Sequence, residues 1–149
     1  MRTTIDINNN HIHFITCHLN SRKNPVARSS QLKQIRNEID KVSEQDLKKV
    51  KFVGGFVIAG DWNICSKGIK EKDEGREYQK LCTLLHPLYD LFEDKKYKHK
   101  FTYFDDKSFR DHCFVSPHFE VVSHDIFDWK TDLGISCSDH LGLEFVLKI

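Results

Sequence analysis

Three polar clusters in this sequence carry side chains suited to hydrolytic chemistry. The first is His18, and the second is the pair Asp61 and Asn63, which point the same way in an extended chain. The third is Asp139 with His140, which sets a hard oxygen ligand beside a titratable base. A carboxylate beside an amide can accept a proton or bind a metal ion while the amide donates to an anion. These residue types therefore suit proton transfer next to a metal ion or a phosphate.

Each cluster adjoins a predicted strand, and a strand end can hold a side chain rigidly at a cleft. Thr3–Ile7 and His11–Cys17 are predicted to form a hairpin around Asn8–Asn10, which tolerates the positive φ of a tight turn. Phe52–Ala59 is almost entirely apolar, which is typical of a strand buried on both faces. Leu141–Leu147 alternates apolar and other residues and closes the chain as a strand.

Two helices are predicted between these strands. Apolar residues at intervals of three and four predict a helix from about Ala27 to Val42, followed by a polar connection over Ser43–Lys51. A long loop over Gly60–Gly75 precedes a second helix, Arg76–Leu85, which Pro87 ends. Short strands are expected at Phe101–Phe104, Cys113–Ser116 and Glu120–Ser123. The order of elements favours an α/β sandwich over a helix bundle.

Composition excludes several classes of protein. The chain has 149 residues, enough for one domain, and its 39% hydrophobic and 30% charged content excludes wholesale disorder. A net charge of +1 gives no electrostatic signature of a nucleic-acid or membrane binder. No apolar run is long enough to span a membrane, and the N-terminus does not resemble a signal peptide. Five cysteines without a C-x-x-C pair favour reduced thiols, so we expect an intracellular protein, cytoplasmic or nuclear.

A histidine pair lies outside the three clusters. His11 and His13 share one face of the second predicted strand. A metal site needs a third ligand, which the local spacing does not supply, so we expect a solvated strand face.

As an ordered set, the clusters resemble the motifs of the endonuclease/exonuclease/phosphatase superfamily. The residues that carry the resemblance are His18-Leu19, Gly60–Asn63 and Ser138–His140. This superfamily includes deoxyribonuclease-like and apurinic endonucleases, neutral sphingomyelinases, inositol-phosphate phosphatases and 5′-type tyrosyl-DNA phosphodiesterases. The resemblance covers about residues 11–149.

Connecting segments carry the same resemblance. Arg28–Leu32 is similar to the R-x-x-Q-L at the start of the family's helix, and Asp90-Leu91 is similar to its buried aspartate. Phe101–Tyr103 resembles its F-T-Y/W strand. The segment around Asp111 departs from the family's R-x-D-Y, because Arg110 directly precedes the aspartate and His112 replaces the aromatic residue.

The resemblance implies a hydrolytic dyad and a metal ligand. His140 corresponds to the general base that activates the attacking water. Asp111 corresponds to the aspartate that orients this histidine, and Asp139 corresponds to a metal ligand. The implied cofactor is Mg²⁺, with Mn²⁺ as a possible substitute.

The resemblance also implies residues at the scissile phosphate. Asp61 corresponds to the aspartate that acts as general acid or metal partner in different members. Asn63 and His18 correspond to groups that contact the phosphate oxygens and stabilise the transition state. Such groups meet the needs of phosphodiester hydrolysis, namely an in-line water, a base and positive charge for the oxygens.

The implied fold is α/β, a two-sheet β-sandwich flanked by helices in four layers. Family domains are much longer than this chain, and their N-terminal half carries an early asparagine and a metal-binding glutamate. Nothing before His18 resembles either residue. Residues 1–149 are therefore expected to form a single domain that corresponds to the C-terminal portion of the family's domain, with the N-terminal half absent.

The predicted function is a Mg²⁺-dependent phosphodiesterase or nuclease. The alternative is a catalytically incomplete half-domain that serves as a fragment or an interaction module. Nucleic acid is favoured over a sphingomyelin-type lipid as substrate, since Lys95–Lys100 could meet phosphates and Trp62 could stack on a base. A solvated loop is the commoner explanation of the lysine run, and local packing is the commoner explanation of Trp62. Glu77-Tyr78 resembles sphingomyelinases, so the lipid alternative stays open, as does the oligomeric state.

Overall fold

A five-stranded mixed sheet forms the centre of the molecule. The computed structural model describes residues 1–8, 10–21, 24–48, 52–66, 72–93, 95–97 and 100–149. The strands are β1 (Arg2–Ile7), β2 (Asn10–His18), β3 (Phe52–Asp61), β4 (Tyr89–Asp90) and β5 (Asp111–Val115). They pair in the order β1-β2-β3-β5-β4, and only the β2–β3 pair is parallel.

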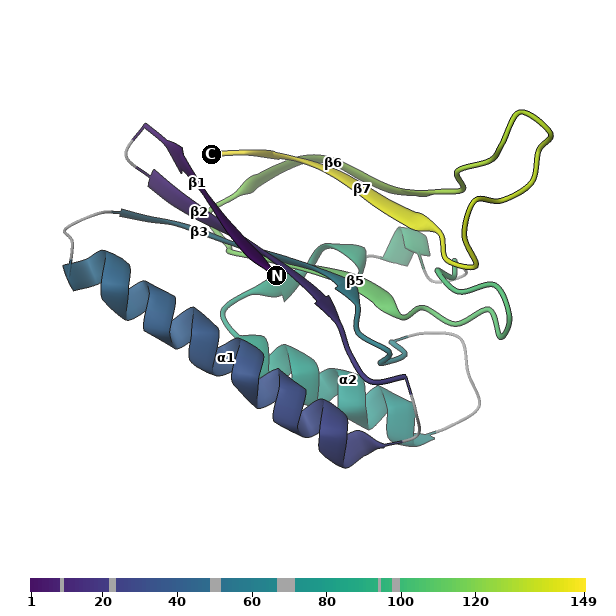
Figure 1. The fold of residues 1–149 in the computed structure, drawn as a ribbon, viewed down its shortest axis with the longest axis horizontal. Helices are drawn as coiled ribbons and strands as arrows, with labels where there is room; N and C mark the ends of the chain where they lie inside the picture. Colours follow the sequence, from purple (N-terminus) through teal and green to yellow (C-terminus); the bar gives the residue numbers. More distant parts are fainter. Residues whose placement is uncertain (9, 22–23, 49–51, 67–71, 94, 98–99) are drawn as a thin grey trace.

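Two helices cover one face of this sheet and a hairpin covers the other (Figure 1). The helices are α1 (Pro25–Lys48) and α2 (Lys72–Leu85), and the hairpin pairs β6 (Glu120–Phe127) with β7 (Gly142–Lys148). Two 3₁₀ turns, η1 (Leu91–Glu93) and η2 (Lys95–Tyr97), follow β4. The α/β class and the two sheets are as predicted, but the described residues build three layers and not four.

The central strand β3 is buried on both faces, as its apolar run predicts. Phe56 and Ile58 belong to the core beneath the helices, while Val57 between them belongs to the core beneath the hairpin. All three side chains are 5% exposed or less. Burial of each such side chain contributes about 1.5–3 kcal/mol, so β3 ties the two core layers together.

Helix α1 begins where the sequence predicts and ends later. Asn24 caps it by accepting a hydrogen bond from the Ala27 amide at 3.0 Å, and Pro25 occupies the first turn. The predicted polar connection after Val42 is wrong for the described residues, because the helix continues to Lys48. This extension carries Asp46 over the face of β2 that bears His11 and His13, and the predicted solvated face is therefore buried instead.

The other elements differ in smaller ways. The hairpin of β1 and β2 is confirmed, and Asn8 in its turn has a φ of 52°. Helix α2 begins at Lys72, earlier than predicted. The strand expected at Phe101–Phe104 is reduced to isolated bridges from Tyr103 to Ser108 and His140. No helix among the described residues has the length and apolarity to cross a membrane.

A buried polar cluster joins α2, β4 and β5. The Asp90 carboxylate accepts hydrogen bonds from the Tyr78 hydroxyl at 2.8 Å, His112 Nδ1 at 2.7 Å and the Phe92 amide at 3.0 Å. His112 is fully buried, and its Nε2 contacts the Ile64 carbonyl oxygen at 3.0 Å. Burial by itself would raise the pKa of Asp90, but the charge and hydrogen bond of His112 hold it below its usual range.

We expect Asp90→Asn to lower the free energy of unfolding by about 3–5 kcal/mol at pH 7, because it breaks a buried charged pair. The folded-state pKa of Asp90 lies below the unfolded value, so its contribution is present above about pH 4 and lost as the pH falls further. Urea unfolding at several pH values measures both effects. Asp40→Asn, which removes an exposed ion pair with Arg36, is the control and should cost about 0.5 kcal/mol or less. Equal losses in the two variants would contradict the prediction.

Candidate active-site cleft

Strand register brings three of the predicted residues to one end of the sheet. The parallel pairing of β2 with β3 sets His18 opposite Asp61. The antiparallel pairing of β3 with β5 sets Asp61 opposite Asp111. Neighbouring strands lie about 4.8 Å apart, so these three residues form a row across three adjacent strands.

This row depends on the close approach of β2 and β3 at Gly60. Gly60 pairs with Cys17 and has a φ of 149°, a conformation that residues with a side chain rarely adopt. A Cβ atom at this position would lie 2.0 Å from the Cys17 carbonyl oxygen. The glycine of the Gly60–Asn63 motif is thus required by backbone packing directly before Asp61.

His140 lies in the loop before β7. Residues 102–103 hold this loop at the end of the sheet where Asp61 and Asp111 lie. The Thr102 side-chain oxygen accepts hydrogen bonds from the Arg110 amide at 2.9 Å and the Asp111 amide at 3.1 Å. The Thr102 carbonyl oxygen accepts one from the Leu141 amide at 2.7 Å. Thr102 is fully buried, and it connects the two chain segments that carry Asp111 and His140.

His140 and Asp111 form a hydrogen-bonded dyad. His140 Nδ1 lies 2.7 Å from Asp111 Oδ2, and an ionised carboxylate can only accept, so Nδ1 carries the proton in this arrangement. His140 Nε2 is directed to the cleft and lies 3.8 Å from Asp61 Oδ2. Burial raises the pKa of Asp111 above its usual range, while hydrogen bonds with Thr102 and His140 act in the opposite direction.

Asp61 is the meeting point of the other predicted groups. Its Oδ1 accepts a hydrogen bond from the Asn63 amide at 2.8 Å, and its Oδ2 accepts one from Asn63 Nδ2 at 3.0 Å. Asn63 Nδ2 also donates to the Leu19 carbonyl oxygen at 2.9 Å, so this amide fixes the loop after β2. His18 Nε2 lies 3.5 Å from Asp61 Oδ2, and the His18 side chain is 75% exposed. His18 is therefore the member of this group best placed to meet a ligand from solution.

The loop after β2 is also held from the helices. Arg28 of α1 forms a two-pronged ion pair with Glu77 of α2 at 2.7 and 2.8 Å and donates to the Asn20 carbonyl oxygen at 3.2 Å. Gln31 accepts a hydrogen bond from the Asn20 amide at 3.0 Å. The Arg28–Leu32 motif thus positions the segment that follows His18.

These side chains line one cleft of about 510 Å³. All six predicted site residues border it, namely His18, Asp61, Asn63, Asp111, Asp139 and His140. Ser21, Tyr103 and Arg110, to which the sequence analysis assigned no role in the site, border it as well. The structure thus brings the predicted residues together, while the role of each stays a prediction.

Tyr103 and Arg110 add an aromatic wall and a positive charge. The Tyr103 ring packs on the His140 ring with centroids 4.8 Å apart. The Arg110 guanidinium lies 4.8 Å from the Tyr103 ring centroid and forms an ion pair with Asp106. Arg110 was visible in the sequence only as a displaced motif residue, and the position of Tyr103 depends on its bridge to His140.

Trp62 has no place in this cleft. Its side chain is fully buried, its Nε1 donates to the His112 carbonyl oxygen at 3.1 Å, and its ring packs on Phe114. Of the two alternatives, local packing is correct and stacking on a base is wrong. The run Lys95–Lys100 lies partly outside the described residues.

The cleft offers the type of ligand atom that Mg²⁺ prefers. Asp61 and Asp139 offer carboxylate oxygens, which this hard cation prefers, and Mg²⁺ commonly keeps several waters when two carboxylates hold it. The ligand atoms of the cleft do not form a group of three residues within 4.8 Å of one another among the described residues. Among the described residues, the group of three whose ligand atoms lie within 4.8 Å of one another is His11, His13 and Asp46, outside the cleft.

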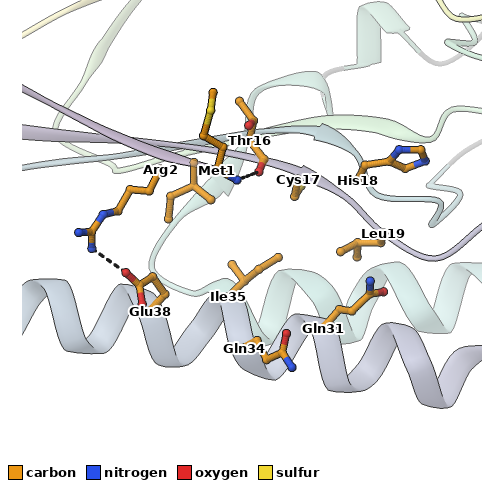
Figure 2. Close-up of a pocket in the computed structure, with 11 residues that line it drawn as sticks. Met1, Arg2, Thr16, Cys17, His18, Leu19, Gln31, Gln34, Ile35 and Glu38 are labelled. Carbon is orange, nitrogen blue, oxygen red and sulfur yellow. Dashed lines mark hydrogen bonds and ion pairs between the residues drawn. The ribbon is translucent and has the colours of Figure 1, made fainter.

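A second pocket of about 390 Å³ lies between the β1–β2 hairpin and α1 (Figure 2). His18 borders both cavities. The ion pair of Arg2 with Glu38 closes one side at 2.6 Å, and the amino group of Met1 donates to the Thr16 carbonyl oxygen at 3.0 Å. Neither Asp111 nor His140 lines this second pocket, so the cleft that holds their dyad is the candidate active site.

Comparison with solved structures identifies the type of fold. No model of a protein family matches the sequence, and no curated protein matches it. Humanized D. rerio TDP2 with 14 mutations matches with a TM-score of 0.69 at 20% identity, over 99% of this chain and 59% of that one. An endonuclease/exonuclease/phosphatase family protein from Bacteroides thetaiotaomicron matches with a TM-score of 0.60 at 18% identity, over 92% of this chain and 49% of that one. The chain has part of the endonuclease/exonuclease/phosphatase fold.

The chain matches only part of each of the TDP2 structures. D. rerio TDP2 complexed with single strand DNA product matches with a TM-score of 0.68 at 20% identity, over 99% of this chain and 60% of that one. The chain therefore spans about three fifths of the length of these TDP2 structures. The expected resemblance to the endonuclease/exonuclease/phosphatase superfamily is confirmed at the level of fold.

We expect Gly60→Ala to destabilise the protein by more than about 1 kcal/mol, because the added Cβ meets the Cys17 carbonyl oxygen and the φ is unfavourable. Gly75→Ala is the matched control, since Gly75 lies in α2 with nothing near its Cβ position, and it should stabilise by up to about 1 kcal/mol. Denaturant unfolding measures both changes. A neutral Gly60→Ala variant would show that this contact does not constrain β2 and β3.

We expect His140 to be the Nδ1–H tautomer when its ring is neutral, because Nδ1 faces the Asp111 carboxylate. Long-range ¹H–¹⁵N NMR distinguishes the two tautomers. Asp111→Asn should increase the Nε2–H population of His140, whereas Asp40→Asn, an exposed substitution on α1 outside the cleft, should leave it unchanged. An unaltered tautomer in Asp111→Asn would exclude the dyad.

Proposed function

We propose that this chain provides the catalytic cleft of a metal-dependent phosphodiester hydrolase. One observation supports it above all others. His140 is held through Nδ1 by the buried carboxylate of Asp111, while its Nε2 faces a cleft that also contains the carboxylates Asp61 and Asp139. A base oriented in this way beside hard oxygen donors is suited to activating water next to a phosphate.

The proton path follows from the dyad. His140 Nε2 takes the proton of the attacking water, and the resulting imidazolium is stabilised by Asp111 at 2.7 Å. Asp61 Oδ2 lies 3.8 Å from this nitrogen, and its carboxylate is suited to proton transfer at the leaving oxygen or to metal binding. His18 and Arg110 supply hydrogen-bond donors toward the phosphate oxygens.

Asp139 and Asp61 are the residues proposed to hold Mg²⁺, with Mn²⁺ as a substitute. When bound, the cation supplies positive charge that offsets the charge of the phosphate oxygens. Asn63 contributes by position, since its amide hydrogens hold Asp61 and the Leu19 carbonyl oxygen in place.

Nucleic acid is the proposed substrate class. One support is the fold of D. rerio TDP2, a protein whose solved complex holds a single strand DNA product. A second is the Arg110 side chain, which borders the cleft, is ion-paired with Asp106 and carries guanidinium N–H donors suited to a phosphate group. A sphingomyelin-type lipid is the competing substrate, and turnover of detergent-dispersed sphingomyelin without turnover of DNA would favour it.

We expect Mg²⁺-dependent cleavage of a generic phosphodiester, and of a single-stranded DNA oligonucleotide, by the wild-type chain. His140→Ala should lower kcat by about 10²–10⁴-fold, because it removes the general base. His86→Ala is the matched control, since His86 is exposed and lies outside the residues that line the cleft, and it should keep full activity.

Thermal unfolding should show that the His140→Ala variant stays folded. Full activity in this variant would exclude His140 as the base. No turnover by a folded wild-type chain would instead favour the alternative of a catalytically incomplete half-domain.

A further inference from the structure

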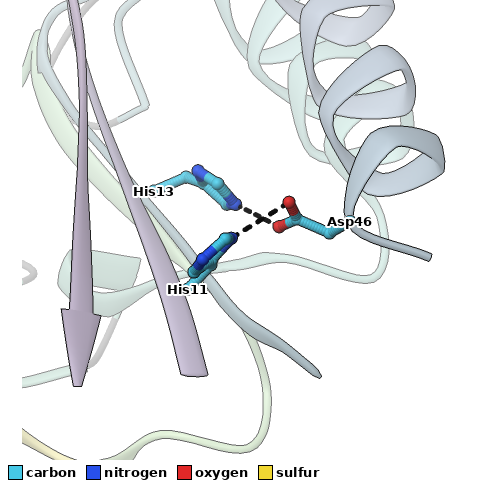
Figure 3. A group of neighbouring side chains, drawn as sticks. All are labelled: His11, His13 and Asp46. Atoms are coloured by element: carbon cyan, nitrogen blue, oxygen red, sulfur yellow. Dashed lines mark hydrogen bonds and ion pairs between the residues drawn. The ribbon is translucent and has the colours of Figure 1, made fainter. Parts of the chain in front are cut away.

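A second cluster of metal-ligating side chains lies at the other end of β2 (Figure 3). His11 and His13 project from β2 toward α1, where Asp46 meets them. His13 is 3% exposed and Asp46 is 4% exposed, whereas the His11 side chain keeps 14% exposure. His18 in the cleft lies seven positions after His11 along β2, which is about 23 Å at the rise of a strand.

The ligand atoms of this cluster are close to the spacing of a tetrahedral zinc site. His11 Nδ1 lies 3.0 Å from Asp46 Oδ1, and His13 Nε2 lies 2.7 Å from Asp46 Oδ2. Zinc bonds of about 2.0–2.1 Å place tetrahedral ligand atoms roughly 3.3 Å apart. Reaching this spacing moves the His11 and His13 nitrogens about 0.3 and about 0.6 Å away from the Asp46 oxygens. All the ligand atoms already lie within 4.8 Å of one another.

The outer nitrogens of both histidines are already oriented by β1. His13 Nδ1 lies 3.0 Å from the Thr4 hydroxyl, and His11 Nε2 lies 3.4 Å from Asp6 Oδ2. The hairpin register sets Thr4 opposite His13 and Asp6 opposite His11. Metal-bound histidines commonly donate their second N–H to such an oxygen, which fixes the tautomer that leaves the other nitrogen to the metal.

We propose that His11, His13 and Asp46 form a binding site for Zn²⁺ or a similar divalent transition-metal ion, separate from the cleft. Two imidazole nitrogens and one carboxylate supply three ligands, through His11 Nδ1, His13 Nε2 and Asp46. The fourth position is left to water, which reaches the site on the exposed side of His11. The ion takes the place of the two hydrogen bonds to Asp46 and clamps the hairpin to the end of α1.

The site does not depend on the proposed hydrolase function, and its test needs no activity. Isothermal titration with Zn²⁺ is run in excess Mg²⁺ on the His140→Ala chain, which lacks the cleft's imidazole base. One zinc ion per chain is expected, together with a rise in the thermal unfolding temperature. His11→Gln, the mildest change because His11 is partly exposed, should weaken zinc binding by at least about 100-fold, and Thr4→Val by about 10-fold.

His86→Gln in the same background is the matched control and should bind zinc with unchanged affinity. Asp46→Asn, which replaces the carboxylate ligand, is the second variant of the site. Circular dichroism shows whether each variant is folded. Co²⁺ in place of zinc should give absorption bands without a thiolate charge-transfer band. The proposal is overturned by equal affinity in the His140→Ala chain with and without His11→Gln, or by a thiolate band. It is also overturned by no zinc binding to the folded chain, which would identify a hydrogen-bonded triad only.

Discussion

The row of side chains at the base of the cleft is positioned by β3, a strand buried between two neighbouring strands and two core layers. Its register with β2 and β5 sets His18, Asp61 and Asp111 in a row. That register requires β2 and β3 to approach closely at Gly60, where no side chain fits. Because one residue of slip would turn each side chain to the opposite face, the packing of Ile58 and its neighbours also specifies the row.

Imidazole rings beside carboxylates recur in this fold with different surroundings. The pairs of His140 with Asp111, His112 with Asp90 and His13 with Asp46 all have nitrogen–oxygen distances of 2.7 Å. The His112 and His13 side chains are 3% exposed or less, whereas that of His140 is 24% exposed. Solvent exposure therefore distinguishes the three pairs. A catalytic base must reach a reacting water, whereas a buried pair stabilises the structure or holds an ion.

The local elements were predictable because their signals are local. The pairing of β1 with β2, the apolar run of β3 and the spacing of the apolar residues of α1 all agree with the structure. The end of α1 was not predictable in this way. Its last turns carry few apolar residues, and the buried Asp46 that holds them meets partners from β2, thirty-three and thirty-five residues away in the sequence. Tertiary contacts here override the local preference.

The sequence by itself determined which residue types stand beside the predicted strands, and the resemblance of these motifs identified six of the nine residues that border the cleft. The chemistry of a side chain and its place after a predicted strand are local features, and they can be read in order along the chain. The tertiary structure alone decided that Thr102 joins the segments of Asp111 and His140, that Trp62 belongs to the core, and that α1 supplies a third ligand to the histidine pair. These outcomes depend on the packing of segments distant in sequence, which no local pattern specifies.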